Sequence, residues 1–177
     1  PMHSLSGKYI IVFNGEIYNH LEIRNVLEEK GYKVNWKGHS DTETLLASID
    51  YLGIEETLKS AIGMFAFALW DKEKNILTLG RDRLGEKPLY YGWQGDTFLF
   101  GSELKAIRKH PSFIGEIDRG SLALMMRHGY VPSPFSIYKG IFKLNPGNLL
   151  YLSLENKEPK KIIYWSEDCK QTFIDAF

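Results

Sequence analysis

Short apolar runs separated by polar segments follow one another along this chain, and their spacing predicts the order of strands and helices. The first half is expected to hold a strand at residues 8–13, a helix at 18–30, a strand at 32–36, and helices at 42–52 and 54–60. Ser40 or Asp41 is a natural N-cap for the helix at 42–52, and Glu43 follows Ser40 by three positions, as in a capping box. The pattern therefore predicts a strand followed mainly by helices.

The second half of the chain is dominated by strands that come in pairs. The predicted elements are hairpins at 64–70 with 76–79 and at 89–93 with 97–100, a helix that begins at Ser102 or Glu103, a helix capped by Asp118, and a last antiparallel pair at 149–152 with 161–164. The strand at 64–70 is apolar at almost every position, which predicts burial on both faces. In the helix capped by Asp118 we expect Leu122, Leu124 and Met125 on the inner side.

Helices in blocks, together with strands in hairpins, favour an α+β fold with mostly antiparallel sheets over a doubly wound parallel sheet. At least six strands are too many for one small sheet that is covered by helices on only one face. Two sheets packed face to face, with helices outside, would bury the strands that are apolar on both faces. A length of 177 residues fits one domain with a substantial core.

The composition limits the classes of binding partner and the cellular compartment that are expected for this chain. Lys plus Arg equals Asp plus Glu, 22 against 22, so no basic excess points to nucleic acid or to an anionic membrane. No apolar run approaches the roughly 20 residues of a membrane span. Cys169 is the only Cys, which excludes an internal disulfide and indicates a reducing, cytoplasmic compartment. The five His residues lack metal-ligand spacing and no nucleotide-binding glycine motif occurs, so no metal and no cofactor are expected in this chain.

The segment Asn14-Gly15-Glu16 is the first candidate site, because it lies where the first strand leads into the first helix. The Asn14 amide and the Gly15 backbone N–H are two donors that can converge, as an oxyanion hole requires. The alternative is a plain turn, since Asn-Gly is a common turn pair, and this segment taken alone favours the turn.

Three other polar segments each have a structural interpretation, and two of them also have a functional one. The segment 40–43 can cap a helix, or its carboxylate at Asp41 can accept hydrogen bonds from an ammonium ligand. The segment 80–90 contains two Gly, one Pro and alternating charges, so it is either a salt-bridged connection between hairpins or a wall near a site. The segment 102–106 is typical of an ordinary helix start. Cys169 has no neighbour in the sequence that would make it a nucleophile.

Taken in order, several segments resemble the class II glutamine amidotransferase domain, whose catalytic residue is an N-terminal nucleophile. They are FNGEIYNH, HSDTETLL, GMFAFALWD, GRDRLGEKPLYYG, GSELKAI, HGYVPSPFSIYKGIFKLNPGN and the closing YW. The resemblance runs from about Tyr9 to Trp165. It is closest to glutamine-hydrolysing asparagine synthetases because of the segment that begins HGYVPSP. Each motif alone has low specificity, whereas all of them in this order are a strong signal.

The resemblance implies a four-layer αββα sandwich of antiparallel sheets, the N-terminal-nucleophile (Ntn) hydrolase type of α+β fold. In that family an N-terminal Cys attacks the side-chain amide of L-glutamine. The released ammonia passes to a synthetase domain, where ATP activates aspartate. Asn14 and Gly15 match the family's oxyanion hole, which makes them the expected catalytic residues. Asn14, Gly15, Glu16 and Asp41 match glutamine-binding positions, with Glu16 and Asp41 at the α-amino end.

This sequence opens at Pro1 without the Cys and the Arg-containing segment with which the family begins. We therefore expect an amidotransferase domain at residues 1–165 that is truncated at its N-terminus, followed at 166–177 by the start of a linker to a synthetase domain. ATP and Mg²⁺ would belong to that synthetase domain of the same parent chain, and the parent enzyme could be a homodimer. Residues 1–177 alone are expected not to hydrolyse glutamine. The alternatives are a domain that supplies ammonia to a different acceptor, and a non-catalytic scaffold with the same fold.

Overall fold

The computed structural model describes residues 1–166 of the chain. The described helices are α1 (His20–Glu29), α2 (Asp41–Leu52), α3 (Ile54–Ser60), α4 (Leu104–Ile107) and α5 (Arg119–His128). The described strands are β1 (Met2–His3), β2 (Tyr9–Ile17), β3 (Gly63–Asp71), β4 (Ile76–Arg81), β5 (Tyr90–Gln94), β6 (Thr97–Gly101), β7 (Ile141–Lys143), β8 (Asn148–Ser153) and β9 (Lys160–Ile163). The predicted linker at 166–177 lies outside the described residues except for its first position, and Cys169 lies outside them as well.

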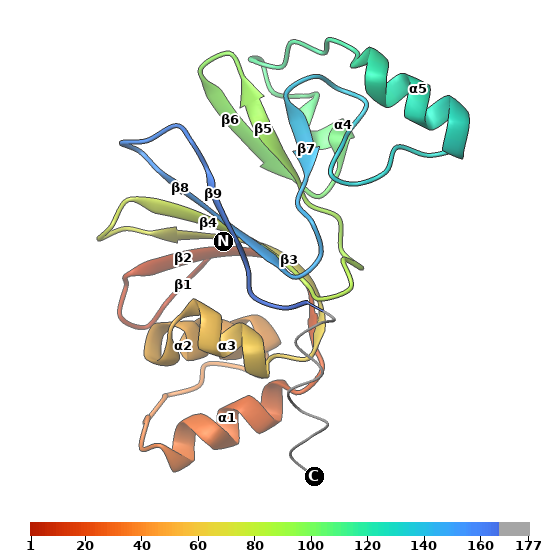
Figure 1. Ribbon diagram of the computed structural model, residues 1–177. Coiled ribbons are helices and arrows are strands. Elements are labelled where there is room, and N and C mark those ends of the chain that lie inside the picture. The colour runs from red at the N-terminus through yellow and green to blue at the C-terminus, as the bar shows by residue number, and fades with distance from the viewer. Residues whose placement is uncertain (167–177) are drawn as a thin grey trace.

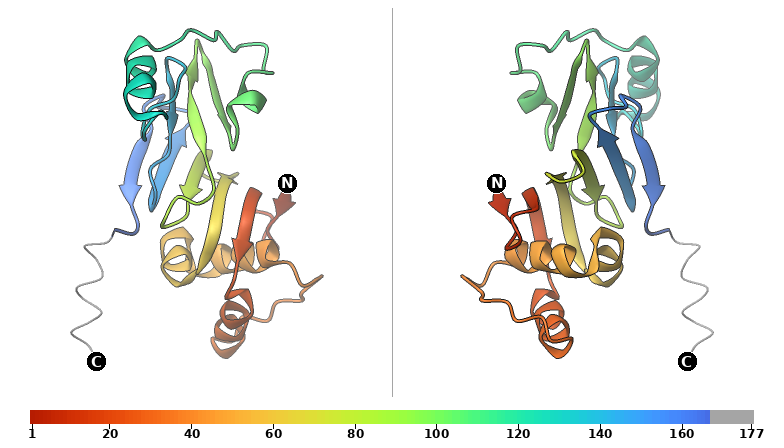
Figure 2. Two further views of the ribbon diagram at one scale, coloured as in Figure 1. Left: turned by 90° about the vertical axis from the view of Figure 1, so that its right-hand side faces the viewer. Right: turned by 90° about the vertical axis from the view of Figure 1, so that its left-hand side faces the viewer.

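The strands form two antiparallel sheets. The larger sheet has six strands in the order β1-β2-β3-β4-β8-β9, and the smaller has three in the order β6-β5-β7. Figure 1 shows α1, α2 and α3 on the outer side of the larger sheet, with α4 and α5 beside the smaller one. The same succession of layers is visible after a turn of 90° (Figure 2). The predicted α+β fold, four αββα layers with antiparallel sheets facing each other, is confirmed.

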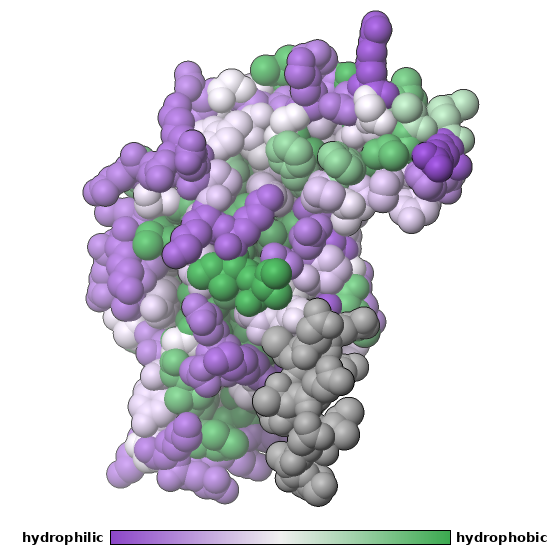
Figure 3. All heavy atoms as spheres, viewed as in Figure 1, coloured by the Kyte–Doolittle hydropathy of each residue, from purple (hydrophilic) through white to green (hydrophobic). Residues whose placement is uncertain are grey.

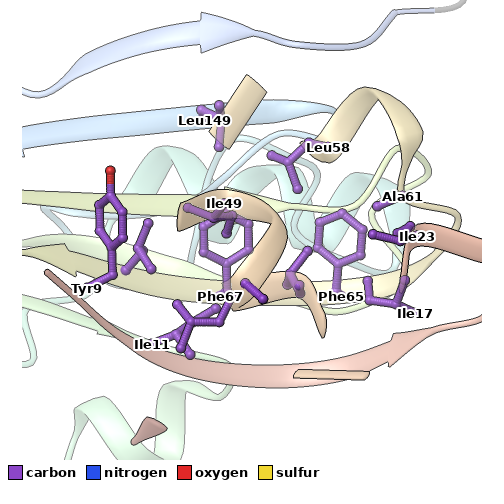
Figure 4. Close-up of a cluster of buried hydrophobic side chains, with 14 of the residues drawn as sticks. Tyr9, Ile11, Ile17, Ile23, Ile49, Leu58, Ala61, Phe65, Phe67 and Leu149 are labelled. Carbon is purple, nitrogen blue, oxygen red and sulfur yellow. The ribbon is translucent and has the colours of Figure 1, made fainter. Parts of the chain in front are cut away.

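Each boundary between layers has its own buried apolar cluster. The largest cluster joins the larger sheet to its helices, and Figure 4 shows Ile11, Ile17, Ile49, Phe65 and Phe67 gathered in it. A second cluster lies between the two sheets, and a third joins the smaller sheet to α4. Side chains of β3 enter both the first and the second cluster. Burial on both faces therefore explains why β3 is apolar at nearly every position.

The hydrophobic pattern located most of these elements correctly. Helices α1, α2 and α3 lie where helical spacing predicts them, and the hairpins β3–β4 and β5–β6 pair as expected. The last pair, β8 with β9, is also confirmed. Both predicted N-caps are present, because the Ser40 side chain accepts a hydrogen bond from Thr42 N–H and the Asp118 side chain accepts one from Ser121 N–H.

The predicted strand at residues 32–36 is wrong. The structure has no strand there, and the alternating side chains pack against the helical cluster instead of pairing with a neighbour. The ring of Tyr32 lies 4.5 Å from the ring of Tyr51, and the ring of Trp36 lies under an Arg side chain of α1. A period of two in apolar residues was therefore produced by packing on helices, which the sequence alone cannot distinguish from a half-buried strand.

The inner face predicted for α5 is only partly correct. Leu122 and Met125 are 39% and 36% exposed, and Ser121 is the buried residue of this helix. Figure 3 shows hydrophobic residues at the surface in the region of α5, at the upper right. Leu124 lines an open groove of about 450 Å³ together with residues of β7, so the apolar side of the helix is incompletely covered.

Candidate functional site

The polar residues of the first candidate segment lie inside β2, so the turn interpretation of Asn14-Gly15 is wrong. β2 pairs with β3 along its whole length, from Tyr9 to Ile17, and so runs four residues beyond the predicted end at position 13. An extended strand turns successive side chains to opposite faces. Ile17 is buried in the helical cluster, so Asn14 and Glu16 point to the opposite face, the side of the smaller sheet. Both are exposed there.

The backbone N–H of Gly15 faces the open edge of β2. Strand β1 borders β2 only at its beginning, where the Tyr9 carbonyl accepts a hydrogen bond from Ser4 N–H. Backbone groups of alternate residues point to the same edge of a strand. Further along that edge, Ile17 N–H donates to Asp41 Oδ2 at 2.9 Å. Gly15 is separated from Tyr9 and from Ile17 by an even number of positions, so its N–H points to this edge as well.

Glycine is required at position 15 by the close approach of β3. A Cβ added at Gly15 would lie 2.2 Å from the carbonyl oxygen of Met64 and 2.6 Å from Cα of Phe65. Both obstacles are backbone atoms, which cannot rotate away. The partner strand approaches equally closely, because a Cβ added at Gly63 would lie 2.1 Å from the carbonyl oxygen of Glu16. The two glycines hold this part of β2 tightly against β3.

The Asn14 amide reaches across to the smaller sheet. Its Nδ2 donates a hydrogen bond to Ser102 Oγ at 2.9 Å, just after β6 ends. A cavity of about 80 Å³ opens beside this contact, lined by residues of β2, β3 and β6 that include Asn14, Ala66 and Ser102. From the sequence, Ser102 is predicted only as a helix start, because no local pattern connects it with Asn14. An amide donor thus lies at the rim of a small cavity between the sheets.

Asp41 both caps a helix and meets β2. Its Oδ1 accepts hydrogen bonds from Thr42 N–H at 2.7 Å and from Thr42 Oγ1 at 3.3 Å, while Oδ2 binds Ile17 N–H. The predicted capping box is wrong in one respect, because Glu43 does not return to Ser40 and binds other backbone N–H groups instead. Asp41 is partly buried and keeps lone pairs that could accept a further donor.

The structure thus brings most of the predicted site to one end of β2. Asn14, Gly15 and Asp41 belong to two elements that meet there through the hydrogen bond to Ile17. Glu16 lies between Gly15 and Ile17 in β2. Its exposed side chain points to the side of the smaller sheet, whereas Asp41 comes from α2 on the other side. Among the described residues, no hydrogen bond joins Glu16 to Asp41 directly, so a ligand would have to bridge them.

The segment 80–90 supports the strand behind this site through a buried carboxylate. Asp82 is fully buried, and its carboxylate accepts hydrogen bonds from four backbone N–H groups. The donors are Phe65 at 3.2 Å, Leu84 at 3.1 Å, and Glu86 and Lys87 at 2.9 Å each. Phe65 is the residue opposite Gly15 in the β2–β3 register, so the loop holds β3 at the position where the site lies.

A buried guanidinium completes the same loop. Arg81 donates to the carbonyl oxygens of Lys87 at 2.7 Å, Leu144 at 2.6 Å and Gly85 at 2.5 Å. Burial lowers the pKa of Arg81 below its usual value, and the neighbouring Asp82 opposes that shift. Within residues 1–166, none of the ion pairs joins two charged residues of this segment, so the salt-bridge interpretation is wrong: Arg81 and Asp82 bind the backbone.

No group of three or more His, Cys, Asp or Glu side chains within residues 1–166 is arranged to hold a metal ion. None of the helices described above has both the length and the apolar character that crossing a membrane requires.

Comparison with known proteins agrees with the resemblance seen in the motifs. A family profile described as "Glutamine amidotransferase domain" matches residues 1–165. A protein of Methanocaldococcus jannaschii, provisionally named asparagine synthetase [glutamine-hydrolyzing] 2, is 42% identical over 158 residues, which are 88% of this chain and 30% of that protein. Asparagine synthetase [glutamine-hydrolyzing] 3 of Bacillus subtilis is 38% identical over 171 residues, or 96% of this chain and 27% of that protein.

A solved structure shows the same fold at low identity. It is the glutamine phosphoribosylpyrophosphate amidotransferase of B. subtilis in complex with ADP and GMP, with a TM-score of 0.65 and 19% identity. The match covers 94% of this chain and 31% of that one. At this identity the likeness supports the fold and nothing beyond it. The chain spans about a third or less of the length of each of these proteins.

Proposed function

Because this chain belongs to the glutamine amidotransferase domain family over residues 1–165, we propose that it is the glutaminase domain of an asparagine synthetase. In this proposal the domain hydrolyses L-glutamine, and the ammonia serves the ATP-dependent amidation of aspartate in a synthetase domain of the same protein. The single observation that carries the proposal is that the last four residues of β2 hold the Asn14 amide donor, the Gly15 N–H at the open edge, and Ile17 N–H, which binds Asp41.

The proposed role of Asn14 and Gly15 is to stabilise an oxyanion. Attack on the amide carbon of glutamine turns the carbonyl oxygen into an anion, and donors already in place stabilise that charge without reorganisation. Asn14 Nδ2 would exchange its bond to Ser102 Oγ for one to this oxygen, and Gly15 N–H would supply the second. Residues 1–166 contain no Cys, so the described residues supply the oxyanion side of the site and not the thiol that the family uses.

The proposed role of Asp41 and Glu16 is to bind the α-amino end of glutamine. A carboxylate accepts charge-assisted hydrogen bonds from an ammonium group, and these are stronger than neutral ones. Asp41 is held against β2 by its bond to Ile17 N–H, so it is preorganised for this task. Glu16 lies next to Gly15 in β2, so one ligand could contact both the amine end and the oxyanion donors.

The proposal also covers the cofactors, the compartment and the oligomeric state of the natural full-length protein. The relatives are about three to four times as long as the matched part, and two of them carry the name of glutamine-hydrolysing asparagine synthetases. We therefore propose that ATP and Mg²⁺ bind in a synthetase domain of the natural chain, that the enzyme works in the cytoplasm, and that it could act as a homodimer.

The test is the release of glutamate from glutamine by the natural full-length protein. Asn14→Ala is expected to lower the rate by about 10²–10³-fold, the usual effect of removing one oxyanion donor. Asn25→Ala, which changes the same residue type at an exposed position of α1, is the matched control and should leave the rate unchanged. A wild-type rate in Asn14→Ala would contradict the assignment.

The acceptor needs a separate measurement. With glutamine and ATP supplied, formation of asparagine that depends on aspartate supports the asparagine synthetase proposal. Glutamate release without asparagine formation would instead support a different ammonia acceptor. Absence of both reactions would favour the non-catalytic scaffold.

A further inference from the structure

Arg24 of α1 is a charged residue that no motif singled out, yet it is almost completely buried. Its exposed fraction is 7%. Burying a guanidinium is costly unless its N–H donors are satisfied, so its partners show what the burial achieves.

The hydrogen bonds of Arg24 all go to one short segment of the chain. Nε donates to Thr44 Oγ1 at 2.7 Å. One terminal nitrogen donates to the carbonyl oxygen of Gly38 at 3.0 Å, and the other to the carbonyl oxygen of Ser40 at 3.1 Å. The three acceptors lie immediately before α2 and in its first turn. The fork of Arg24 therefore ties α1 to the start of α2.

Two further side chains strengthen this attachment. The carboxylate of Glu43 lies 3.6 Å from the Arg24 guanidinium and also accepts hydrogen bonds from Lys37 N–H at 2.8 Å and Gly38 N–H at 3.2 Å. The ring of Trp36 lies 4.0 Å from the guanidinium carbon in a cation–π contact. The connection between α1 and α2, which forms no strand, is thus fixed by one charged group at its centre.

Asp41 lies in the middle of this arrangement. Ser40 precedes it and Thr44 follows it by three residues, and both are bound to Arg24. On its other side, Asp41 binds Ile17 N–H at the end of β2, and α1 begins three residues later. A closed path therefore runs from β2 through α1 and Arg24 to the start of α2, and back to β2 through Asp41.

We propose that Arg24 is a positioning residue that holds Asp41 in register with the end of β2, where the amine end of the ligand would bind. This inference rests on the proposed function for what the ligand is, but not for the geometry. Arg24 makes no contact with the ligand in this proposal. Lys would replace the guanidinium poorly, because it offers a point charge and lacks the planar fork that reaches three acceptors at fixed angles.

The kinetic test uses the natural full-length protein with Arg24→Lys and Arg24→Met. If Asp41 is displaced, one charge-assisted bond to the ligand is lost, so KM for glutamine should rise about 10- to 100-fold in Arg24→Met. kcat should stay within about threefold, because binding common to ground and transition states was removed. Arg24→Lys should lie between Arg24→Met and wild type. The control is Arg127→Met on the exposed side of α5, which should match wild type. A fall in kcat with KM unchanged would overturn the proposal, since a purely structural defect reduces the amount of active protein.

A second measurement does not depend on catalysis. In Arg24→Lys, the amide of Ile17 should exchange its hydrogen at least about tenfold faster, because its acceptor Asp41 is no longer fixed. The amide of Leu69, in the middle of β3, should keep its wild-type protection. Unchanged protection of Ile17 would overturn the positioning role. If wild-type protein fails to hydrolyse glutamine, the proposed function fails, and the exchange of Ile17 still decides whether Arg24 positions Asp41.

Discussion

Replacement of Gly15 by Ala tests whether the close approach of β2 to β3 holds the proposed oxyanion donors in place. An added Cβ would lie 2.2 Å from the Met64 carbonyl oxygen, whereas ordinary contacts of a Cβ begin at 3.4 Å. One strand must therefore move by about 1.2 Å at this point, since rigid backbone forms the obstacle. The Asp82 bond to Phe65 N–H resists movement of β3, so β2 is the strand expected to move.

The structure sets the expected size of two effects of Gly15→Ala, one on the free energy of unfolding and one on the rate of glutamine hydrolysis. Overpacking a tight site costs typically about 1–3 kcal/mol, and we expect the upper end because no flexible side chain can give way. A shift of about 1 Å in a group that positions substrate can lower the rate about 10²-fold. Gly15→Ala should therefore lower the free energy of unfolding by about 3 kcal/mol and glutamine hydrolysis by about two orders of magnitude.

The assays are urea unfolding and glutamate release, both with the natural full-length protein. Gly38→Ala is the matched control, because its φ lies outside the left-handed region and an added Cβ meets nothing within 4 Å. Gly38 binds Arg24 and Glu43 through its backbone carbonyl and N–H only, and Ala keeps both groups. It should resemble wild type in both assays. Equal behaviour of Gly15→Ala and Gly38→Ala would refute the reasoning, because it would show that β2 tolerates a side chain against β3.

Two further predictions concern a buried carboxylate and a buried phenol elsewhere in the fold. Asp82→Asn removes acceptors from buried N–H groups and should lower the free energy of unfolding, measured in urea, by about 3 kcal/mol; an unchanged urea midpoint would contradict the role of this carboxylate. Burial raises the pKa of Tyr151 to about 12, whereas Tyr in an unfolded chain has its ordinary pKa of about 10. Stability should therefore fall as pH rises from about 10 to 12, and Tyr151→Phe should make that fall shallower; identical pH profiles would exclude Tyr151 as its source.

Local patterns predicted the elements of the fold well where neighbours in sequence are also neighbours in space. The helices α1 and α2 and the hairpin β3–β4 depend on contacts between residues a few positions apart, so their periodicity is visible in the sequence. The failure at residues 32–36 has the opposite cause. Their alternation comes from contacts with two helices, one of which lies later in the chain.

The sequence supplied candidate residues for the site but did not predict their geometry. Asn14, Gly15, Glu16 and Asp41 were chosen from the chemistry of their side chains and from family motifs. The sequence also favoured a turn at Asn14-Gly15, because Asn-Gly is common in turns. Pairing with β3 over the whole of β2 overrode that preference, and the pairing depends on two glycines about 50 residues apart.

Local sequence patterns predicted the α+β class and the order of most elements, and they supplied candidate residues for the chemistry. The tertiary structure alone decided how these residues meet. The bond from Asn14 to Ser102 spans 88 positions, and the bond from Ile17 to Asp41 spans 24. Contacts over such separations arise only when layers pack, because local periodicity reports which face a residue occupies and not what lies opposite it. The same reason explains why Arg24 became visible as a positioning residue only in the folded chain.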